Sequence, residues 1–236
     1  MLIDLSKRSN EEELMDDPNV TEEALNVALS DISRVNRLLG GTSITVKAVF
    51  NQIKKTPVVK KWVLIDLGCG DGEMLRYIAK HARKENISIQ LIGIDTNDKC
   101  IVRARKMSVE YPEISYYTQD IFKLTKQDFN CDIIICTLTL HHFGDEGIKK
   151  VLKKSMELVS TAVIINDIHR NQMTYYLFKL FSFFFIQGYV AKNDGLVSIK
   201  RGFKREELVN FAKELQLKKY QLHWKWAFRY RWIIDI

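Results

Sequence analysis

Short runs of consecutive apolar residues alternate with stretches of helical periodicity through the middle of the chain. The apolar runs lie at 62–67, 89–94, 132–138 and 161–166, with a weaker one at 114–118. The helical stretches between them lie near 73–84, 97–108 and 146–158. Continuous apolar runs suit strands that are buried on both faces of a parallel sheet. Strands that alternate with helices in this way predict an α/β fold with a doubly wound sheet.

The first quarter of the chain has a different pattern, because residues 11–56 show helical periodicity without intervening strands. Thr21 can cap a helix whose first turn carries two glutamates, which suits the positive end of the helix dipole. A glycine pair ends this helix, and a second amphipathic helix follows at about 43–55. We therefore expect an N-terminal helical extension, over residues 1–57, on a single domain.

The end of the chain alternates strictly, with aromatic or apolar residues at the even positions from Tyr220 to Trp232. Such alternation predicts strand with one face exposed to water. Because thirteen residues are long for one strand, we expect a hairpin that turns near Trp226 to Phe228. The favoured interpretation is an antiparallel edge that closes the sheet over a last helix at 204–215. The alternative is nucleic-acid binding by aromatic side chains interleaved with basic ones.

Composition and charge narrow the class of protein. The 236 residues are 46% apolar and 28% charged, as in a folded soluble protein. The net charge of +7 is spread along the chain, which disfavours nucleic acid as a partner. The four cysteines have no metal-ligand spacing and the N-terminus turns acidic too early for a signal peptide, so we expect reduced thiols in a cytoplasmic protein.

A glycine-rich segment, LIDLGCGDGEML at residues 64–75, links the first strand to the next helix. A dinucleotide-binding loop needs a third glycine where this sequence has Glu73 or Leu75, and the Gly-Lys-Ser/Thr ending of a phosphate loop is absent. Carboxylates at Asp66, Asp71 and Glu73 would also repel a phosphate. A phosphate-free cation, S-adenosylmethionine (SAM), fits this loop better.

Acidic residues follow the next two strands. Asp95 ends the second strand, where a carboxylate can accept two hydrogen bonds from a ribose diol. Asp120 follows the third strand and is placed to accept from an adenine amino group, with Ile121 as an apolar wall. The structural alternatives are a helix cap at Asp95 and a turn residue at Asp120.

The chain resembles the class I SAM-dependent methyltransferases in four segments. These segments are LIDLGCGDG, LIGIDTN, YTQDIF and CDIIICTLTLHHF, which occur in this order through the middle of the chain. The resemblance implies a Rossmann-like doubly wound sheet, mostly parallel, with SAM as cofactor, S-adenosylhomocysteine (SAH) as product and no metal. The residues that it implies for the cofactor site are Asp66, Gly68, Cys69, Gly70, Gly72, Asp95, Thr96, Asp120, Ile121 and Thr137. Thr137 would line the methionyl end.

Other segments narrow the resemblance within that class. TLTLHHF after the fourth strand is similar to small-molecule methyltransferases, including the quinone-biosynthesis group. RSNEEELMDDP, RVNRLLGG and NDIHR are similar to a bacterial group associated with polyketide- or quinone-like compounds, and in that group Arg37 would approach the SAM carboxylate. The resemblance implies a core at 58–236 with a lid insertion at about 171–200, within one domain over residues 1–236.

The candidate catalytic residues are His141 and His142, at the carboxyl end of the fourth strand, where open α/β sheets bind their ligands. One of them could act as a general base, since an imidazole titrates near neutral pH. The alternative is that both imidazoles only shape the pocket. His169 and Arg170 are weaker candidates; the arginine could hold an acidic acceptor or form an ion pair.

Residues 174–190 are apolar or aromatic nearly all round, with Lys179 as the only charge. A helix of this kind is buried or faces something apolar. We expect a lipophilic, aromatic or polyketide/quinone-like small molecule as the methyl acceptor. Peripheral membrane contact, a homodimer through this segment and plain burial stay open, as do methylation of RNA or protein and a non-catalytic SAM-binding role.

Overall fold

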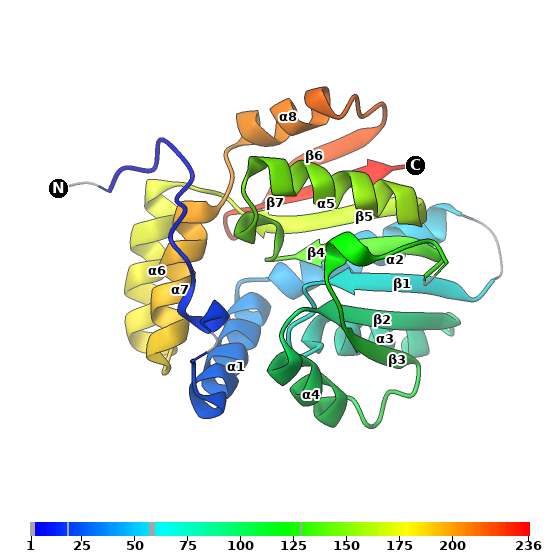
Figure 1. Ribbon diagram of the computed structural model, residues 1–236, viewed down its shortest axis with the longest axis horizontal. Coiled ribbons are helices and arrows are strands. Elements are labelled where there is room, and N and C mark those ends of the chain that lie inside the picture. Colours follow the sequence, from blue (N-terminus) through cyan, green and yellow to red (C-terminus); the bar gives the residue numbers. More distant parts are fainter. Residues whose placement is uncertain (1–2, 18, 57–59, 128) are drawn as a thin grey trace.

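The computed structural model describes residues 3–17, 19–56, 60–127 and 129–236. Its centre is a seven-stranded sheet with the strand order β3-β2-β1-β4-β5-β7-β6 (Figure 1). The strands are β1 (Trp62–Leu67), β2 (Ile89–Asp95), β3 (Ile114–Thr118), β4 (Cys131–Thr137), β5 (Val159–Ile168), β6 (Tyr220–Lys225) and β7 (Arg229–Asp235). The first five are parallel, and β7 runs antiparallel to both β5 and β6. The predicted doubly wound sheet with an antiparallel C-terminal edge is therefore confirmed.

Helices cover both faces of the sheet, and each face has its own apolar core. The helices are α1 (Glu22–Leu38), α2 (Gly41–Lys55), α3 (Glu73–Lys84), α4 (Asp98–Met107), α5 (Asp145–Leu158), α6 (Gln172–Phe185), α7 (Tyr189–Arg201) and α8 (Arg205–Glu214). Side chains of α2, α3 and α4 pack on one face, and those of α5 and α8 pack on the other. This burial on both sides explains why the strands read as continuous apolar runs.

The strand order reverses between β1 and β4, because the chain runs outward from β1 to β3 and then returns to the other side of β1. Open α/β sheets bind their ligands at the carboxyl ends of the strands at such a point. The glycine-rich loop follows β1 at this edge, and the His141–His142 pair follows β4. The topology thus brings the two segments singled out from the sequence to one place.

The N-terminal segment differs from the expectation for residues 11–56. Helix α1 begins at Glu22 with Thr21 as its cap, as predicted, but the residues before it form only a short 3-10 turn at Leu14–Asp16. Residues 3–17 otherwise run as an extended strap along α6 and α7 (Figure 1). The helical assignment for this part was wrong, because the strap is held by side-chain contacts to distant elements rather than by its own periodicity.

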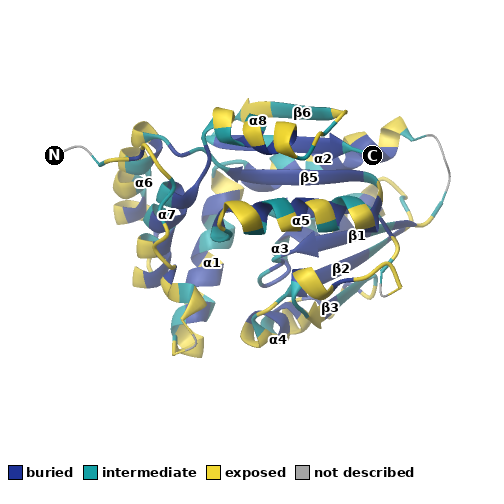
Figure 2. Ribbon diagram, turned by 45° about the horizontal axis from the view of Figure 1, so that its top comes forward, coloured by how far each residue is buried: buried dark blue, intermediate teal, exposed yellow. Residues whose placement is uncertain are grey.

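Helices α6 and α7 form a pair outside the sheet, in the place expected for the lid. One side of α6 faces inward, where Phe178 contacts Gly195 of α7 so closely that a Cβ there would lie 2.2 Å from the ring. Its other side is open to solvent along its length (Figure 2), with Leu180 60% and Phe183 74% exposed. Plain burial is therefore wrong for the outer face. Among the described residues, no helix is long and apolar enough to cross a membrane.

Gly72, at the start of α3, supplies a test of the loop geometry. Its φ is +75°, and a Cβ at this position would lie 2.1 Å from the hydroxyl oxygen of Tyr116. We expect Gly72→Ala to lower the free energy of unfolding by at least about 2 kcal/mol, because the left-handed backbone and the overpacking both oppose a side chain. Urea denaturation measures the loss.

The matched control is Gly144→Ala, where a Cβ would have no neighbour within 4 Å and the φ of −69° suits alanine. This variant should stay within about 0.5 kcal/mol of the wild type, as surface substitutions usually do. Equal losses in the two variants would contradict the steric role of Gly72.

Candidate functional site

The glycine-rich loop leaves β1 with three glycines in left-handed conformation. Gly68, Gly70 and Gly72 have φ values of +72°, +53° and +75°, which residues with a side chain rarely adopt. A Cβ on Gly68 would lie 2.3 Å from Thr139, so the loop also packs directly against the segment that follows β4. The backbone conformation of the loop therefore requires glycine at these alternate positions. Because the glycines have no side chains, main-chain groups are exposed at the carboxyl edge of the sheet.

Two carboxylates, Asp66 and Asp95, lie at the ends of the neighbouring strands β1 and β2, and Asp95 fixes this loop. Asp95 accepts a hydrogen bond from the backbone N–H of Gly70 at 2.9 Å and another from that of Asn97 at 2.9 Å. Burial raises the pKa of Asp95, and burial together with the charge of Asp95 raises the pKa of Asp66 well above its usual range. A cation bound beside them would favour their charged forms. The alternative role expected for Asp95 was that of a helix cap. The N-cap of α4 is Asn97 instead.

A cavity of about 800 Å³ opens over this edge of the sheet. The predicted residues that line it are Asp66, Gly68, Cys69, Gly70, Asp95, Thr96, Asp120, Ile121, Thr137, His141 and His142. Asp120 also caps a short turn by accepting from the N–H of Phe122 at 2.9 Å, so the predicted turn role holds as well. Apolar residues of α6 and α7, among them Phe178 and Ile199, close the other end of the cavity.

Two predicted cofactor residues lie elsewhere. Gly72 is not among the residues that line the cavity, and its lack of a side chain makes room for Tyr116 instead. Arg37 on α1 lies near Glu73 and the Tyr77 hydroxyl, with 3.4 Å separations, and its side chain is 51% exposed. Neither residue lines the cavity in this structure.

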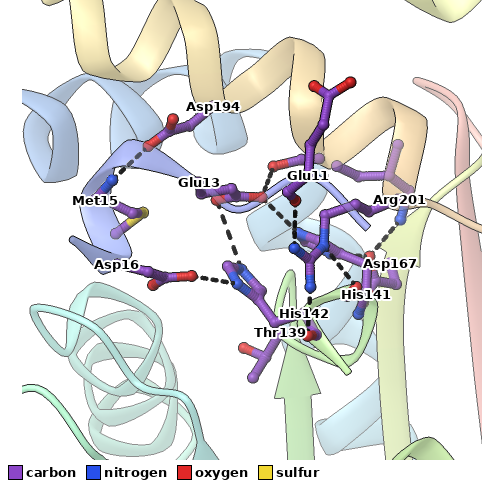
Figure 3. Close-up of polar contacts among 12 residues, drawn as sticks. Glu11, Glu13, Met15, Asp16, Thr139, His141, His142, Asp167, Asp194 and Arg201 are labelled. Atoms are coloured by element: carbon purple, nitrogen blue, oxygen red, sulfur yellow. Dashed lines mark hydrogen bonds and ion pairs between the residues drawn. The ribbon is translucent and has the colours of Figure 1, made fainter. Parts of the chain in front are cut away.

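The two histidines meet three acidic residues from two other parts of the chain (Figure 3). His141 Nδ1 lies 2.7 Å from Asp167 on β5, and its Nε2 lies 3.3 Å from Glu13 in the strap. His142 Nδ1 lies 3.1 Å from Asp16, and its Nε2 lies 3.7 Å from the second oxygen of Glu13. The strap thus contributes two carboxylates to the site.

The charge state of His141 follows from this arrangement. Burial alone would lower its pKa, but Asp167 and Glu13 outweigh it and raise the pKa to about 9. Burial likewise opposes the charged forms of Asp167 and Glu13, whose pKa values are nevertheless lowered by the same imidazole. At neutral pH His141 is therefore a buried imidazolium between two carboxylates. Because it is already protonated, His141 cannot act as a base. Of the two candidate bases, only His142, with a side chain 24% exposed, is available.

Two arginines fasten the strap to this cluster. Arg201 at the end of α7 donates to the backbone carbonyls of Glu11, His141 and His142. Arg8 in the strap donates to the carbonyl of His141 at 3.0 Å and to that of Arg201 at 2.9 Å. The strap, α7 and the loop after β4 consequently form one hydrogen-bonded unit on one side of the cavity.

Glu13, His141 and His142 also have the donor types of a metal site, and one atom of each lies within 4.8 Å of the others. A divalent cation could be held by such a set. The ion pairs around His141, and the hydrogen bond of 2.6 Å from the Ser198 hydroxyl to Glu13, give these groups partners within the protein. The cluster is therefore described as an ion-pair network.

The weaker candidates after β5 have structural roles. Arg170 is fully buried and pairs with both carboxylate oxygens of Glu207, at 2.5 and 3.0 Å. His169 accepts from the Trp224 indole at 3.3 Å and does not line the cavity. The ion pair foreseen as the alternative for Arg170 is thus present, although it is buried rather than on the surface.

Sequence reasoning missed several residues of the site. Glu13 and Asp16 lie in the RSNEEELMDDP segment, which was singled out only for its resemblance to a subgroup. Asp167 lies near the end of β5, much as Asp95 ends β2, so the rule that revealed Asp95 could have found it. Arg229 at the start of β7 lines the cavity, but no local pattern distinguishes it from the other bases of the hairpin.

Comparison with known proteins agrees with the fold and the loop. Residues 64–161 match the family described as "Methyltransferase domain". The ubiquinone biosynthesis O-methyltransferase of Coxiella burnetii is 29% identical over 115 residues, which are 48% of this chain and 46% of that protein. The chain therefore matches about half the length of this curated relative. These matches over the middle of the chain bear out the predicted resemblance to the class I SAM-dependent methyltransferases.

Solved structures resemble the chain over most of its length. The plantazolicin methyltransferase BpumL, in complex with SAH, has a TM-score of 0.66 and 16% identity over 91% of this chain and 95% of that chain. The magnesium protoporphyrin IX methyltransferase ChlM of Synechocystis PCC 6803, with bound SAM, has a TM-score of 0.56 and 15% identity over 86% and 83%. At such low identity these structures establish the fold.

The pKa of His141 leads to a prediction about stability. Its folded-state value of about 9 lies above the ordinary value of 6.5, so its contribution is fully present below pH 6.5 and is lost as the pH rises through about 9. We expect the free energy of unfolding to fall by a few kcal/mol between pH 7 and pH 10, at about 1.4 kcal/mol per pKa unit. Denaturant titrations across this range measure it.

The variant His141→Gln should be less stable at pH 7 but should lack this alkaline fall. His223→Gln, on the exposed strand β6, is the control and should keep it, because burial and nearby cations lower rather than raise the pKa of His223. Parallel pH profiles for the wild type and His141→Gln would show that the imidazole is not charged in the folded protein.

Proposed function

We propose that this chain transfers a methyl group from SAM to a lipophilic small molecule of aromatic, polyketide or quinone type. The observation that carries the proposal is the single cavity, which extends from the glycine-rich loop to the apolar walls of α6 and α7. One end offers main-chain groups and carboxylates, and the other combines aliphatic and aromatic side chains with a few polar ones, among them Asp194 and Ser198. A cationic cofactor and an apolar acceptor could therefore meet within it.

The residues at the loop end fit SAM. When bound, SAM supplies a methyl group on a sulfonium, which a nucleophile can displace. Gly68 and Gly70 let the backbone approach a ligand closely, and each oxygen of Asp95 keeps a lone pair beyond the backbone N–H that it already accepts. The cluster of carboxylates, including Asp66 and Asp120, suits a positive ligand and disfavours a phosphate.

Catalysis in such a site rests chiefly on orientation. Holding two reactants in near-attack geometry can supply about 7–11 kcal/mol of the barrier, so a proton acceptor is needed only for an acceptor group that must lose a proton. For such an acceptor His142 is the base that we propose, since it lines the cavity and His141 is already protonated. Asp16 faces His142 Nδ1 and can stabilise the imidazolium that would form.

The outer face of α6 supports the lipophilic character of the acceptor. Phe178 and Thr174 of this helix line the cavity, while Leu180 and Phe183 are exposed on its other side. One helix thus separates the acceptor end of the cavity from an exposed apolar surface. We propose two partners for this surface. One is a membrane that contains the acceptor, and the other is a second copy of the chain.

The first test uses methyl-labelled SAM with the purified protein and a lysate of the source cells, separated into organic-extractable, nucleic-acid and protein fractions. We expect the label in the organic fraction, from which mass spectrometry identifies the acceptor. Label in RNA or protein would contradict the proposal and favour the basic aromatic hairpin as the acceptor site. SAM binding without transfer to any fraction would favour a non-catalytic role.

A second test concerns the binding of SAM at the loop end of the cavity. We expect Asp95→Ala to weaken SAM binding at least tenfold, about 1.4 kcal/mol, because the carboxylate both orders the loop at Gly70 and faces the cavity. Isothermal titration measures the dissociation constant. The control Glu157→Ala, on the exposed part of α5, should bind SAM as the wild type does. Unchanged affinity in Asp95→Ala would show that the ribose role is misassigned.

A further inference from the structure

Arg229 is a buried arginine at the acceptor end of the cavity. It begins β7 opposite Ile168, the last residue of β5, and its exposed fraction is 5%. It lines the cavity, and its Nη1 atom is buried without a hydrogen-bond partner among the described residues. A guanidinium has five N–H donors, so this side chain still has hydrogen bonds to make.

Other buried arginines of this region are fully engaged. Arg170 pairs with Glu207 and donates to the carbonyls of Leu5 and Gly202, and Arg201 donates to three carbonyls around the histidines. Burial lowers the pKa of Arg229 to about 10, with only the charge of Asp167 acting in the opposite direction, so the side chain remains a cation at neutral pH. A buried cation without hydrogen-bonding partners is costly unless a ligand completes it.

Two residues, Gly41 and Asn36, shape the polar surroundings of the Arg229 guanidinium. A Cβ on Gly41 would lie 2.9 Å from the Arg229 guanidinium carbon and 1.9 Å from the side-chain oxygen of Asn36. The glycine thus allows both polar groups to pack against the start of α2. Asn36 lines the cavity as well, and its side-chain oxygen is also buried with no hydrogen-bond partner in the described part of the chain. Two unsatisfied polar groups therefore lie side by side in a wall that is otherwise largely apolar.

The position of Arg229 in the sheet places it outside the part of the cavity that is proposed to bind SAM. The proposed SAM residues follow β1, β2, β3 and β4, whereas β7 lies two strands past β4, a distance of about 10 Å at the usual strand spacing. Asp167 is the acidic group whose charge acts on Arg229, and it is paired with the His141 imidazolium at 2.7 Å, an imidazolium that Glu13 shares. The cationic side chain thus faces the space left for the acceptor.

We propose that Arg229 receives an anionic group of the acceptor, a carboxylate or an ionised phenol or enol, so that the substrate class is a lipophilic acid. This inference rests on the proposed function and adds the charge of the acceptor to it. A guanidinium binds a carboxylate through two parallel hydrogen bonds, which gives orientation as well as affinity. The apolar remainder of the molecule would lie against Phe178 and Ile199.

The test compares two probes of equal shape, 1-hydroxy-2-naphthoate and the neutral 1-hydroxy-2-naphthamide, by isothermal titration with and without saturating SAH. We expect the wild type to bind the naphthoate at least tenfold more tightly than the amide. Arg229→Met should abolish this preference, and Arg229→Lys should keep part of it. The control Arg231→Met, two residues along the same strand and outside the cavity lining, should keep all of it.

Two further measurements separate this role from others. Arg229→Met should bind SAH as the wild type does, and its melting temperature should not fall, because the change removes a buried charge that lacks a hydrogen-bond partner. A tenfold loss of SAH affinity would instead assign Arg229 to the carboxylate of the cofactor, and a marked loss of stability would assign it a structural role. No charge preference in the wild type would overturn the inference, whereas absent SAH binding would overturn the proposed function itself.

Discussion

A protonated imidazole held between two buried carboxylates joins the N-terminal strap to the sheet. His141 follows β4, Asp167 lies on β5, and Glu13 comes from a segment more than 120 residues away in the chain. Because removing one partner of a buried ion pair leaves a charge without compensation, each of the three groups depends on the other two. Arg201 and Ser198 of α7 contact the same cluster, so the wall of the cavity opposite the sheet depends on it as well.

The parts of the site that the sequence predicted have local causes. Strands buried on both faces need continuous apolar runs, and the loop after β1 needs glycine where φ is positive, so both leave a pattern within ten residues. Asp95 and Asp120 were found because the ends of parallel strands meet at one edge of the sheet. Local periodicity likewise placed α8 within one residue of 204–215 and the hairpin turn between Lys225 and Arg229, although β7 continues to Asp235, three residues past Trp232.

The parts that could not be predicted depend on contacts across long stretches of chain. Nothing in the strap indicates that Glu13 pairs with His141, and its acidic composition is equally compatible with a solvated helix. Arg170 and Arg229 look alike in sequence, as bases beside strand ends; only packing decides that one finds Glu207 while the other keeps an unpartnered nitrogen. The apolar helix α6 is a similar case, since its residues do not reveal which face Phe178 and Gly195 bury.

The two ends of the cavity differ in the charged side chains that line them. Carboxylates gather beside the glycine-rich loop, whereas the acceptor end contains Arg229, whose acidic neighbour Asp167 is paired with His141. A cationic cofactor would pair with the carboxylates of its own end, and an anionic acceptor would accept a hydrogen bond from the unpartnered nitrogen of Arg229, so each ligand would meet complementary groups in a poorly hydrated space. The attraction between the two ligands would also be stronger there than in water, because the lower local dielectric screens it less. Such an arrangement favours a reaction in which a positive methyl donor and an electron-rich acceptor reduce each other's charge.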